Sequence, residues 1–473
     1  MIAKLSNGLK QSLLYGSSIA LMKGVSLLML PFIANHLSTE EFGRLEVIST
    51  IAIIGSILVG MGLDNTLFRF AGAAKTTQQR NKIAADIFSL TLIIGFSFGI
   101  AAWVSSEFIA AWLPGNTSEY EIRLVLFMLA LEGCISIPLG WLRMNNRAIS
   151  FFFASTGRAL THSILVVIQL SLGNGVEGIL EAGLIAAVLQ TLVLSYLHIK
   201  DTGLSISLQT GKQSFIYSLP IVGSGLVAFA LNGLDRWILV EHTSLTDVAE
   251  FGVAAKFALA MVLMMQPFSM WWSPRRFKIL QDINGREEVT RYISLGMILA
   301  LIIAVFVGLA SPLLINWLLP DTYINAGQYA VGLALVMLLR ELVELFNIGC
   351  FTGKTTFTQL VINSIGAVTG VVCMIWLTPI YAVWGIITSL LIAQAIRLTL
   401  FYIASQHFLP LPYPVSPLLI LLISSMSTLF IGTQINSAVL ILFLMIISSS
   451  LLLLTAHLFK LIPLPLILAK DAS

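Results

Sequence analysis

Residues 231–260 read LNGLDRWILVEHTSLTDVAEFGVAAKFALA, two apolar runs separated by a short polar connection. The first run ends at the charged pair Asp235-Arg236, and the second begins at Phe251-Gly252 and carries Lys256 about one helical turn inside it. An ionisable group costs roughly 2.5 to 3.5 kcal/mol at the centre of a bilayer and is a functional candidate by default. The stretch therefore predicts two membrane-spanning helices, the second with a functional lysine.

The composition of the whole chain is that of a polytopic membrane protein. Of its 473 residues, 57% are hydrophobic and 10% are charged, whereas about 25% of the residues of a soluble domain are charged. The formal net charge of +3 gives no reason to expect a nucleic-acid partner. The three cysteines lie in or beside apolar runs without a CxxC pair, so we expect them to be packing residues.

Fourteen apolar runs are long enough to cross a hydrocarbon core of ~30 Å. The first is too long for the apolar region of a signal peptide, so we expect it to be retained. The division of the stretch 358–403 could be drawn differently, because only Thr378-Pro379-Ile380 separates its two runs. The predicted spans are 13–34, 47–68, 86–106, 122–142, 151–172, 178–198, 215–234, 251–272, 292–312, 327–348, 358–377, 381–403, 415–433 and 438–458.

Lysines and arginines are unevenly distributed between the predicted connections. With the N-terminus placed inside, 17 of the 26 fall on the cytoplasmic side, six lie within helices and three lie outside. The positive-inside rule therefore predicts a multi-pass membrane protein with both termini cytoplasmic.

The sequence also indicates two related halves. Glu41-Phe42-Gly43 follows an acidic loop and opens an apolar run, as Glu250-Phe251-Gly252 does 209 residues later. We expect an all-α fold of about 14 transmembrane helices, in which two bundles surround a cavity near the repeat interface. The predicted domains are an N-terminal six-helix bundle at 1–200, a cytoplasmic linker at 201–214, a C-terminal six-helix bundle at 215–404, and helices 13 and 14 with a cytoplasmic tail at 405–473.

Several ionisable residues lie inside predicted spans. Lys23 and Lys256 each share a helix face with small residues. Neither lysine has an acidic residue one turn away on its own helix. Arg158, His162 and Gln169 share one stripe of a 3.6-residue helix. We therefore expect Lys23, Arg158 and Lys256 to face one water-accessible cavity.

The other intramembrane charges have competing interpretations. Arg69 lies close enough to the interface to extend its head out of the membrane, and Arg340 with Glu344 has the spacing of an internal ion pair. His162 alone is as consistent with a hydrogen-bonded interior histidine as with a proton carrier. The candidate substrate-binding cations are Lys23, Arg69, Arg158, Lys256 and Arg340, and the candidates for coupling or counter-charge are Asp64, Glu132, His162 and Glu344.

Catalytic motifs are missing from the sequence. Residues 349–355, GCFTGKT, resemble a P-loop but have one residue too few and follow a membrane helix rather than a strand. HExxH, GxSxG and clustered Cys/His are absent. We therefore expect a transporter with no cofactor and no metal. A membrane-embedded glycosyltransferase or polymerase is disfavoured, because such enzymes need larger polar outer loops.

Three stretches carry a family resemblance: HLSTEEFGRLE at 36–46, GLDNTLFRF at 62–70, and LDRWILVEHTSLTDVAEFGVAAK at 234–256. They resemble the polysaccharide-exporter membrane proteins, the Wzx-type flippases of lipid-linked oligosaccharides, whose superfamily also holds drug/cation antiporters and the lipid II flippase. The resemblance implies that cavity cations receive the pyrophosphate of an undecaprenyl-linked sugar while two bundles rock between inward-open and outward-open states. Lys256 matches a family position that is often basic, and Lys23 lies in the helix where relatives place cavity cations.

The sequence and the resemblance together predict the function. The predicted spans contain six cations but only four acids, Asp64, Glu132, Glu341 and Glu344. The excess of positive charge favours an anionic cargo. We expect a flippase that moves an undecaprenyl-pyrophosphate-linked oligosaccharide to the periplasmic leaflet for O-antigen, capsule or exopolysaccharide synthesis. The alternative is a drug/cation antiporter of the same superfamily. The expected partners are the lipid-linked oligosaccharide, membrane lipid, and a polysaccharide polymerase with its chain-length regulator, around a monomeric protein.

Overall fold

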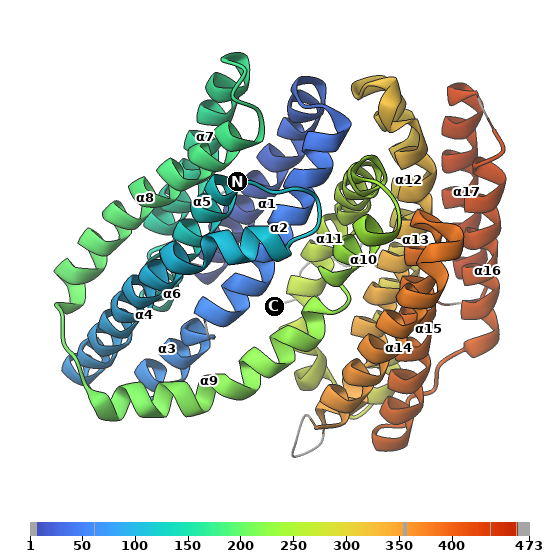
Figure 1. Ribbon diagram of the computed structural model, residues 1–473. Helices are drawn as coiled ribbons and strands as arrows, with labels where there is room; N and C mark the ends of the chain where they lie inside the picture. The colour runs from blue at the N-terminus through green and yellow to red at the C-terminus, as the bar shows by residue number, and fades with distance from the viewer. Residues whose placement is uncertain (1–6, 61, 353–356, 436, 460, 462–473) are drawn as a thin grey trace. The chain divides into compact units, whose positions relative to one another are not determined.

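The computed structural model of the protein describes residues 7–60, 62–352, 357–435, 437–459 and 461 (Figure 1). Within these ranges the chain forms α-helices, two short 3-10 helices and their connections, with no strand. The expected all-α, polytopic architecture is therefore confirmed. Most of the predicted C-terminal tail and part of the GCFTGKT stretch lie outside the described residues.

The chain divides into two compact units, Met1–Ala249 and Glu250–Ser473. In the first unit α7 packs against α1 and α8, α4 packs against α5 and α6, and α9 packs against α2, α3 and α4 (Figure 1). Its helices are α1 (Asn7–His36), α2 (Thr39–Gly60), α3 (Leu63–Gly72), α4 (Thr77–Trp112), α5 (Glu119–Ala130), α6 (Glu132–Met144), α7 (Ala148–Ser171), α8 (Gly175–Thr202), α9 (Leu208–Phe229) and α10 (Leu234–His242).

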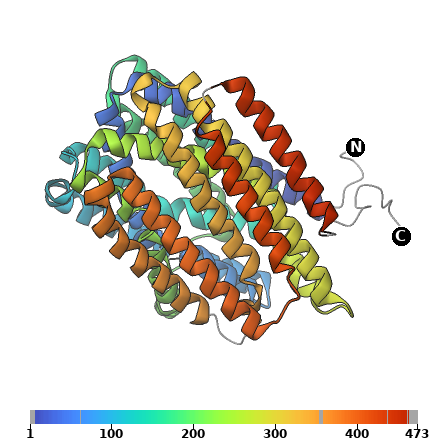
Figure 2. The same ribbon diagram turned by 90° about the vertical axis from the view of Figure 1, so that its right-hand side faces the viewer.

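The second unit is built around α12, which packs against α13, α16 and α17. Figure 2 shows α16 and α17 side by side on this unit. Its elements are α11 (Leu245–Ile279), which begins in the first unit, α12 (Gly285–Leu318), η2 (Asp321–Tyr323), α13 (Ile324–Phe346), η3 (Ile348–Phe351), α14 (Phe357–Tyr381), α15 (Val383–Phe408), α16 (Val415–Gly432) and α17 (Ala438–Leu458).

Each of the fourteen predicted apolar runs falls in one helix or in two consecutive helices. Thirteen helical segments of the described residues are long and apolar enough to cross a membrane. The run predicted at 327–348 corresponds to α13, which carries Arg340, Glu341 and Glu344 and is not among the thirteen. The split predicted within 358–403 is present, because α14 ends at Tyr381 and α15 begins at Val383.

Glycine explains the break between α2 and α3, at the start of the GLDNTLFRF stretch. Gly62 has a left-handed φ of 60°, a conformation that a residue without a Cβ adopts without strain. A Cβ at this position would also lie 2.8 Å from Cγ2 of Ile221 on α9. Position 62 therefore requires glycine both for the turn and for the close approach of α9.

The predicted cytoplasmic linker at 201–214 is bound to α4. Ser205 Oγ donates to Asp86 Oδ1 at 2.5 Å, and Thr210 Oγ1 donates to Asp86 Oδ2 at 3.0 Å. The Asp86 residue is 6% exposed, so both carboxylate oxygens are satisfied by the linker. The compact unit consequently extends through α9 and α10 to Ala249. The division by sequence repeat, which places 215–234 in the second bundle, stays a prediction.

In the second unit α16 is attached to α12 by two glycine contacts. A Cβ at Gly308 on α12 would lie 2.5 Å from Cδ2 of Leu429, and a Cβ at Gly432 on α16 would lie 2.1 Å from Cδ2 of Leu309. Each helix therefore inserts a leucine at a glycine of the other. This reciprocal packing fixes the distance between the two axes.

Aromatic side chains hold the connection from α15 to α16. The ring of Tyr413 lies 5.0 Å from that of Phe346 and 6.0 Å from that of Tyr402, between centroids. Burial raises the pKa of the Tyr413 hydroxyl, which therefore stays protonated at physiological pH. The contacts fix the point at which α16 begins.

Candidate functional site

Two of the three stretches that carry the family resemblance meet in the first unit. Arg236, at the start of α10, donates from Nη1 to both carboxylate oxygens of Asp235 at 3.0 and 2.9 Å. Its Nε lies 3.7 Å from Oε2 of Glu46 on α2. Asp235 and Glu46 are 3% and 5% exposed. The Arg236 guanidinium at 234–246 therefore lies between its neighbouring carboxylate, Asp235, and a carboxylate of the stretch 36–46, Glu46.

The same two stretches also approach through their backbones. A Cβ at Gly43 on α2 would lie 1.9 Å from the carbonyl oxygen of Leu245. The hydroxyls of Thr39 and Thr246 lie 3.5 Å apart, and Trp237 Nε1 donates to Thr50 Oγ1. These contacts make the stretches 36–46 and 234–246 a packed joint of the first unit, with a structural role for Asp235 and Arg236.

Arg158 lies in the middle of α7 and is tied to α8. Its Nη1 donates to Gln190 Oε1 at 3.2 Å, and Gln190 Nε2 donates to the Ala154 carbonyl at 3.0 Å. Gln190 is 7% exposed. Arg158 also lines a groove of about 440 Å³ between α7 and α8, together with Ser150 and Thr161. The guanidinium, which has five donors, is thus held by one neutral partner beside an open groove.

Two other predicted site residues lie near Arg158. The Glu132 carboxylate, at the start of α6, is its acidic neighbour. His162, one turn farther along α7, is half-buried and lies near the backbone of Ile179 on α8. Its Nε2 lies 3.7 Å from the position of a Cβ at Gly183. Glu132 of α6 and His162 of α7 are therefore electrostatic neighbours of Arg158, and the role of His162 stays a prediction.

The remaining predicted residues of the first unit are separate from this cluster. Lys23 is exposed on α1 and Arg69 is exposed on α3, while Asp64 is half-buried and accepts a hydrogen bond from Asn65 at 3.3 Å. Within the described ranges, no hydrogen bond or ion pair joins Lys23, Asp64 or Arg69 to Arg158. A cavity shared with Lys23 and Lys256 stays a prediction.

The second unit carries its own cluster of intramembrane charge. Glu344 on α13 accepts a hydrogen bond from Asn347 at 3.2 Å, and it is the acidic neighbour of Arg276 on α11 and of Arg397 on α15. Arg340 and Glu344, both described, form no ion pair within 4.0 Å, so the intrahelical pair considered from the spacing is not present. Instead, Glu344 interacts with arginines of neighbouring helices.

Arg397 is held between α14 and α15. It donates from Nε and Nη2 to Asn363 Oδ1 at 3.1 and 2.8 Å, and from Nη1 to Gln394 Oε1 at 2.7 Å. A Cβ at Gly366 would lie 2.3 Å from its Cγ. The glycine therefore leaves the space through which this side chain passes, and packing accounts for Arg397 without a ligand.

Lys256 lies half-buried in the first half of α11. The last turns of that helix carry Arg276, whose guanidinium lies 4.6 Å from the ring centroid of Phe351. The sequence predicts Arg276 in a cytoplasmic connection, because the apolar run ends near residue 272.

Among the described residues no group of three or more His, Cys, Asp or Glu side chains is arranged to hold a metal ion.

Comparison with protein families gives the relationship of the chain. The polysaccharide biosynthesis protein family matches residues 9–280, which is more than half of the chain. The chain belongs to this family. The resemblance in the stretches 36–46, 62–70 and 234–256 is thereby confirmed.

Two curated proteins are similar in sequence to this polysaccharide biosynthesis protein. It is 23% identical over 239 residues to the succinoglycan biosynthesis transport protein ExoT of Rhizobium meliloti (strain 1021), covering 50% of this chain and 46% of that protein. It is 23% identical over 330 residues to Lsg locus putative protein 1 of Haemophilus influenzae, covering 66% of this chain and 74% of that protein. The match with ExoT thus spans about half of that relative's length.

Solved structures with the same fold are membrane flippases and transporters. The lipid II flippase MurJ in an inward closed conformation matches with a TM-score of 0.73 at 13% identity, over 95% of this chain and 99% of that one. An inward-facing multidrug resistance MATE transporter of the MOP superfamily matches with a TM-score of 0.58 at 14% identity, over 83% and 94%. At these identities the match shows the fold alone. One of the two relatives is named a transport protein, and the two solved structures are named a flippase and a transporter.

Proposed function

We propose that the protein flips an undecaprenyl-pyrophosphate-linked oligosaccharide from the cytoplasmic to the periplasmic leaflet by alternating access, for O-antigen, capsule or exopolysaccharide synthesis. The observation that carries the proposal is the position of Arg158. A guanidinium in the middle of a membrane helix is costly, and this one has a single hydrogen-bond partner, Gln190, in the described part of the chain. Its other donors are suited to a phosphate oxygen.

The surroundings of Arg158 support an anionic cargo. Gln190 orients the guanidinium without neutralising it, because the amide is uncharged and is itself fixed by the Ala154 carbonyl. Glu132 is the acidic neighbour, so a bound pyrophosphate competes with one carboxylate for the same cation. A site of this kind binds a phosphate reversibly, as a carrier requires, and Glu132 holds the charge balance when the cargo leaves.

The second unit supports the same cargo charge. Three arginines, Arg276, Arg340 and Arg397, lie on α11, α13 and α15 beside two carboxylates, Glu341 and Glu344. The formal balance is positive, as it is for the intramembrane residues of the whole chain. A cation exporter would gain nothing from this excess, so the drug/cation antiporter is the weaker candidate.

The test is complementation of a strain that lacks this gene. We expect Arg158→Ala to stop export of the glycan and to cause lipid-linked repeat units to accumulate on the inner leaflet, while Arg158→Lys keeps part of the activity because it keeps the charge. Arg123→Ala is the matched control, since it removes an arginine of the same unit that is already paired with Glu119. Full export by Arg158→Ala at normal protein level refutes the role of Arg158, and drug resistance without a glycan defect supports the antiporter.

The cellular setting follows from the same proposal. The uneven distribution of Lys and Arg favours a cytoplasmic location for both termini, and an undecaprenyl-linked cargo favours the bacterial cytoplasmic (inner) membrane. A polymerase that consumes the flipped repeat unit, with its chain-length regulator, is the expected functional neighbour of a monomeric carrier.

A further inference from the structure

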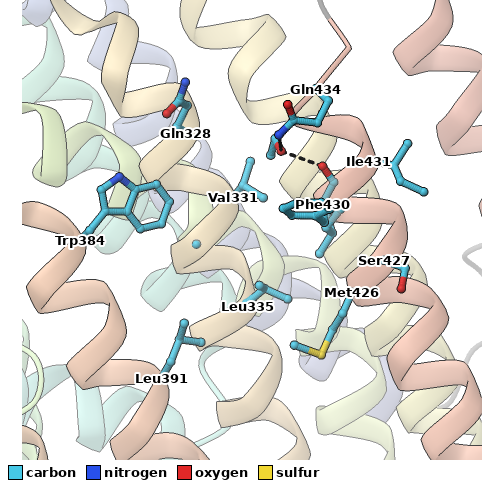
Figure 3. A pocket seen from close by; sticks show the side chains of 13 residues that line it. Gln328, Val331, Leu335, Trp384, Leu391, Met426, Ser427, Phe430, Ile431 and Gln434 are labelled. Carbon is cyan, nitrogen blue, oxygen red and sulfur yellow. Dashed lines mark hydrogen bonds between the residues drawn. The ribbon is translucent and has the colours of Figure 1, made fainter.

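A slot of about 890 Å³ lies in the second unit between α13 and α15 on one side and α16 on the other (Figure 3). Its deeper part is lined by Leu335 of α13, Leu391 of α15 and Met426 of α16, and Phe430 projects beside it. None of the lining residues is charged. The slot is therefore an apolar space between membrane helices.

The packing of α16 explains why this space is open. Leu429 inserts at Gly308 of α12, so α16 is fixed to α12 rather than to α13 or α15. Small residues also line the slot from both sides, Gly332 on α13 and Ser427 on α16. The side chains of the flanking helices consequently do not fill the gap between them.

One end of the slot is polar. Gln328 and Gln434 lie there (Figure 3), and Thr433 precedes Gln434 in the chain. An adjoining cavity of about 250 Å³ shares Gln328 and Thr433 and adds Asn316. Gln434 Nε2 donates to Thr433 Oγ1 at 3.4 Å. In the described part of the chain the Gln328 amide has no hydrogen-bond partner. This end thus offers amide donors and acceptors without any charge.

The length of the slot limits its occupant. Leu335 follows Gln328 by seven residues on α13, and Leu391 follows Trp384 by seven on α15. At 1.5 Å per residue the slot reaches roughly 10 Å from its polar end, which is less than half of a hydrocarbon core of ~30 Å. An occupant therefore stays within one leaflet.

We propose that the slot binds one zwitterionic glycerophospholipid of the surrounding leaflet, such as phosphatidylethanolamine. An acyl chain lies between Leu335 and Met426, and the headgroup meets the amides of Gln328 and Gln434. Amides donate to phosphate and ester oxygens and accept from an ammonium group, whereas an anionic headgroup would find no cation in this lining. The acyl chain moves from the apolar interior of the bilayer into an apolar slot, so its burial gains little. Packing and the hydrogen bonds of the headgroup therefore determine which lipid is preferred.

Native mass spectrometry of the full-length protein tests the proposal. The protein is purified in detergent and mixed with equimolar phosphatidylethanolamine, phosphatidylglycerol and undecaprenyl phosphate. We expect wild-type protein to retain one phosphatidylethanolamine about ten-fold more often than phosphatidylglycerol, the ratio that one or two net hydrogen bonds produce. Ser427→Trp, which fills the slot from an exposed position of α16, should lower this retention about ten-fold.

Two further variants complete the design. Ile446→Trp is the control for Ser427→Trp, because it adds the same ring to an exposed position on α17 away from the slot and should leave retention unchanged. Gln328→Leu should keep the bound lipid but remove the preference between headgroups. Equal retention by Ser427→Trp and Ile446→Trp overturns the proposal, and so does preferential retention of undecaprenyl phosphate, which would assign the slot to the tail of the cargo.

Discussion

Replacement of Arg236 by alanine tests the joint between α2 and α10. The change removes the cation that lies between Asp235 and Glu46, both of which are nearly inaccessible. Removing one partner of a buried ion pair costs about 3–5 kcal/mol, because the opposite charge is left buried. The equilibrium between folded and unfolded protein should therefore shift by a factor of roughly 100 to 4,000.

The measurement is unfolding by sodium dodecyl sulfate in mixed micelles, followed by tryptophan fluorescence. Arg236→Lys keeps the charge but loses the paired hydrogen bonds to Asp235, so we expect it to cost about 1 kcal/mol. The triple change of Glu46→Gln, Asp235→Asn and Arg236→Gln removes all three charges and should recover much of the stability lost in Arg236→Ala. If Arg236→Ala is as stable as wild type, these residues do not form the buried ionic contact described here.

Three other predictions use contacts in both units. Asp86→Ala leaves the hydroxyls of Ser205 and Thr210 without their acceptor, which should lower the stability by about 1–3 kcal/mol. Limited proteolysis should then cleave faster within 201–214, and cleavage at the wild-type rate would contradict the anchoring. Gly366→Ala should destabilise by about 1–3 kcal/mol through overpacking against Arg397, as measured by thermal unfolding, whereas Gly24→Ala, with nothing within 4 Å of the added Cβ, should be neutral. Reporter fusions after Lys212 or at the C-terminus should both read cytoplasmic, and a periplasmic signal from either would reverse the topology.

The helices could be predicted from the sequence because the bilayer imposes their length and composition. A run of about 20 apolar residues must be helical to satisfy its backbone in hydrocarbon, and this holds for α12 as for α17. The ends were harder to place. Arg276 belongs to the last turns of α11 although it lies beyond the apolar run, because a helix continues past the hydrocarbon core wherever its backbone is still paired.

The charged contacts could be predicted only in part. The helical spacing predicted one stripe of Arg158, His162 and Gln169 on α7, but it could not predict that Gln169 donates to Glu181 of α8 at 2.7 Å. The partner of Arg158, Gln190, lies on a different helix, and a single sequence contains no signal for the rotation of one helix against another. The same limit applies to Glu344, which forms no ion pair with Arg340 and whose cationic neighbours Arg276 and Arg397 lie on α11 and α15.

The contact of Glu46 with Arg236 also has a consequence for biosynthesis. The two residues are 190 positions apart in the chain, and ribosomes add about 5–20 residues per second, so Arg236 follows Glu46 after roughly 10–40 s. During this interval α2 is inserted before Arg236, the cation beside the Glu46 carboxylate, has been synthesised. The surface at Gly43 is likewise inserted before the chain near Leu245 that packs on it. The N-terminal unit can therefore close only after α10 has been synthesised, and until then the nascent protein depends on the insertion machinery to shield a charge at the edge of the membrane.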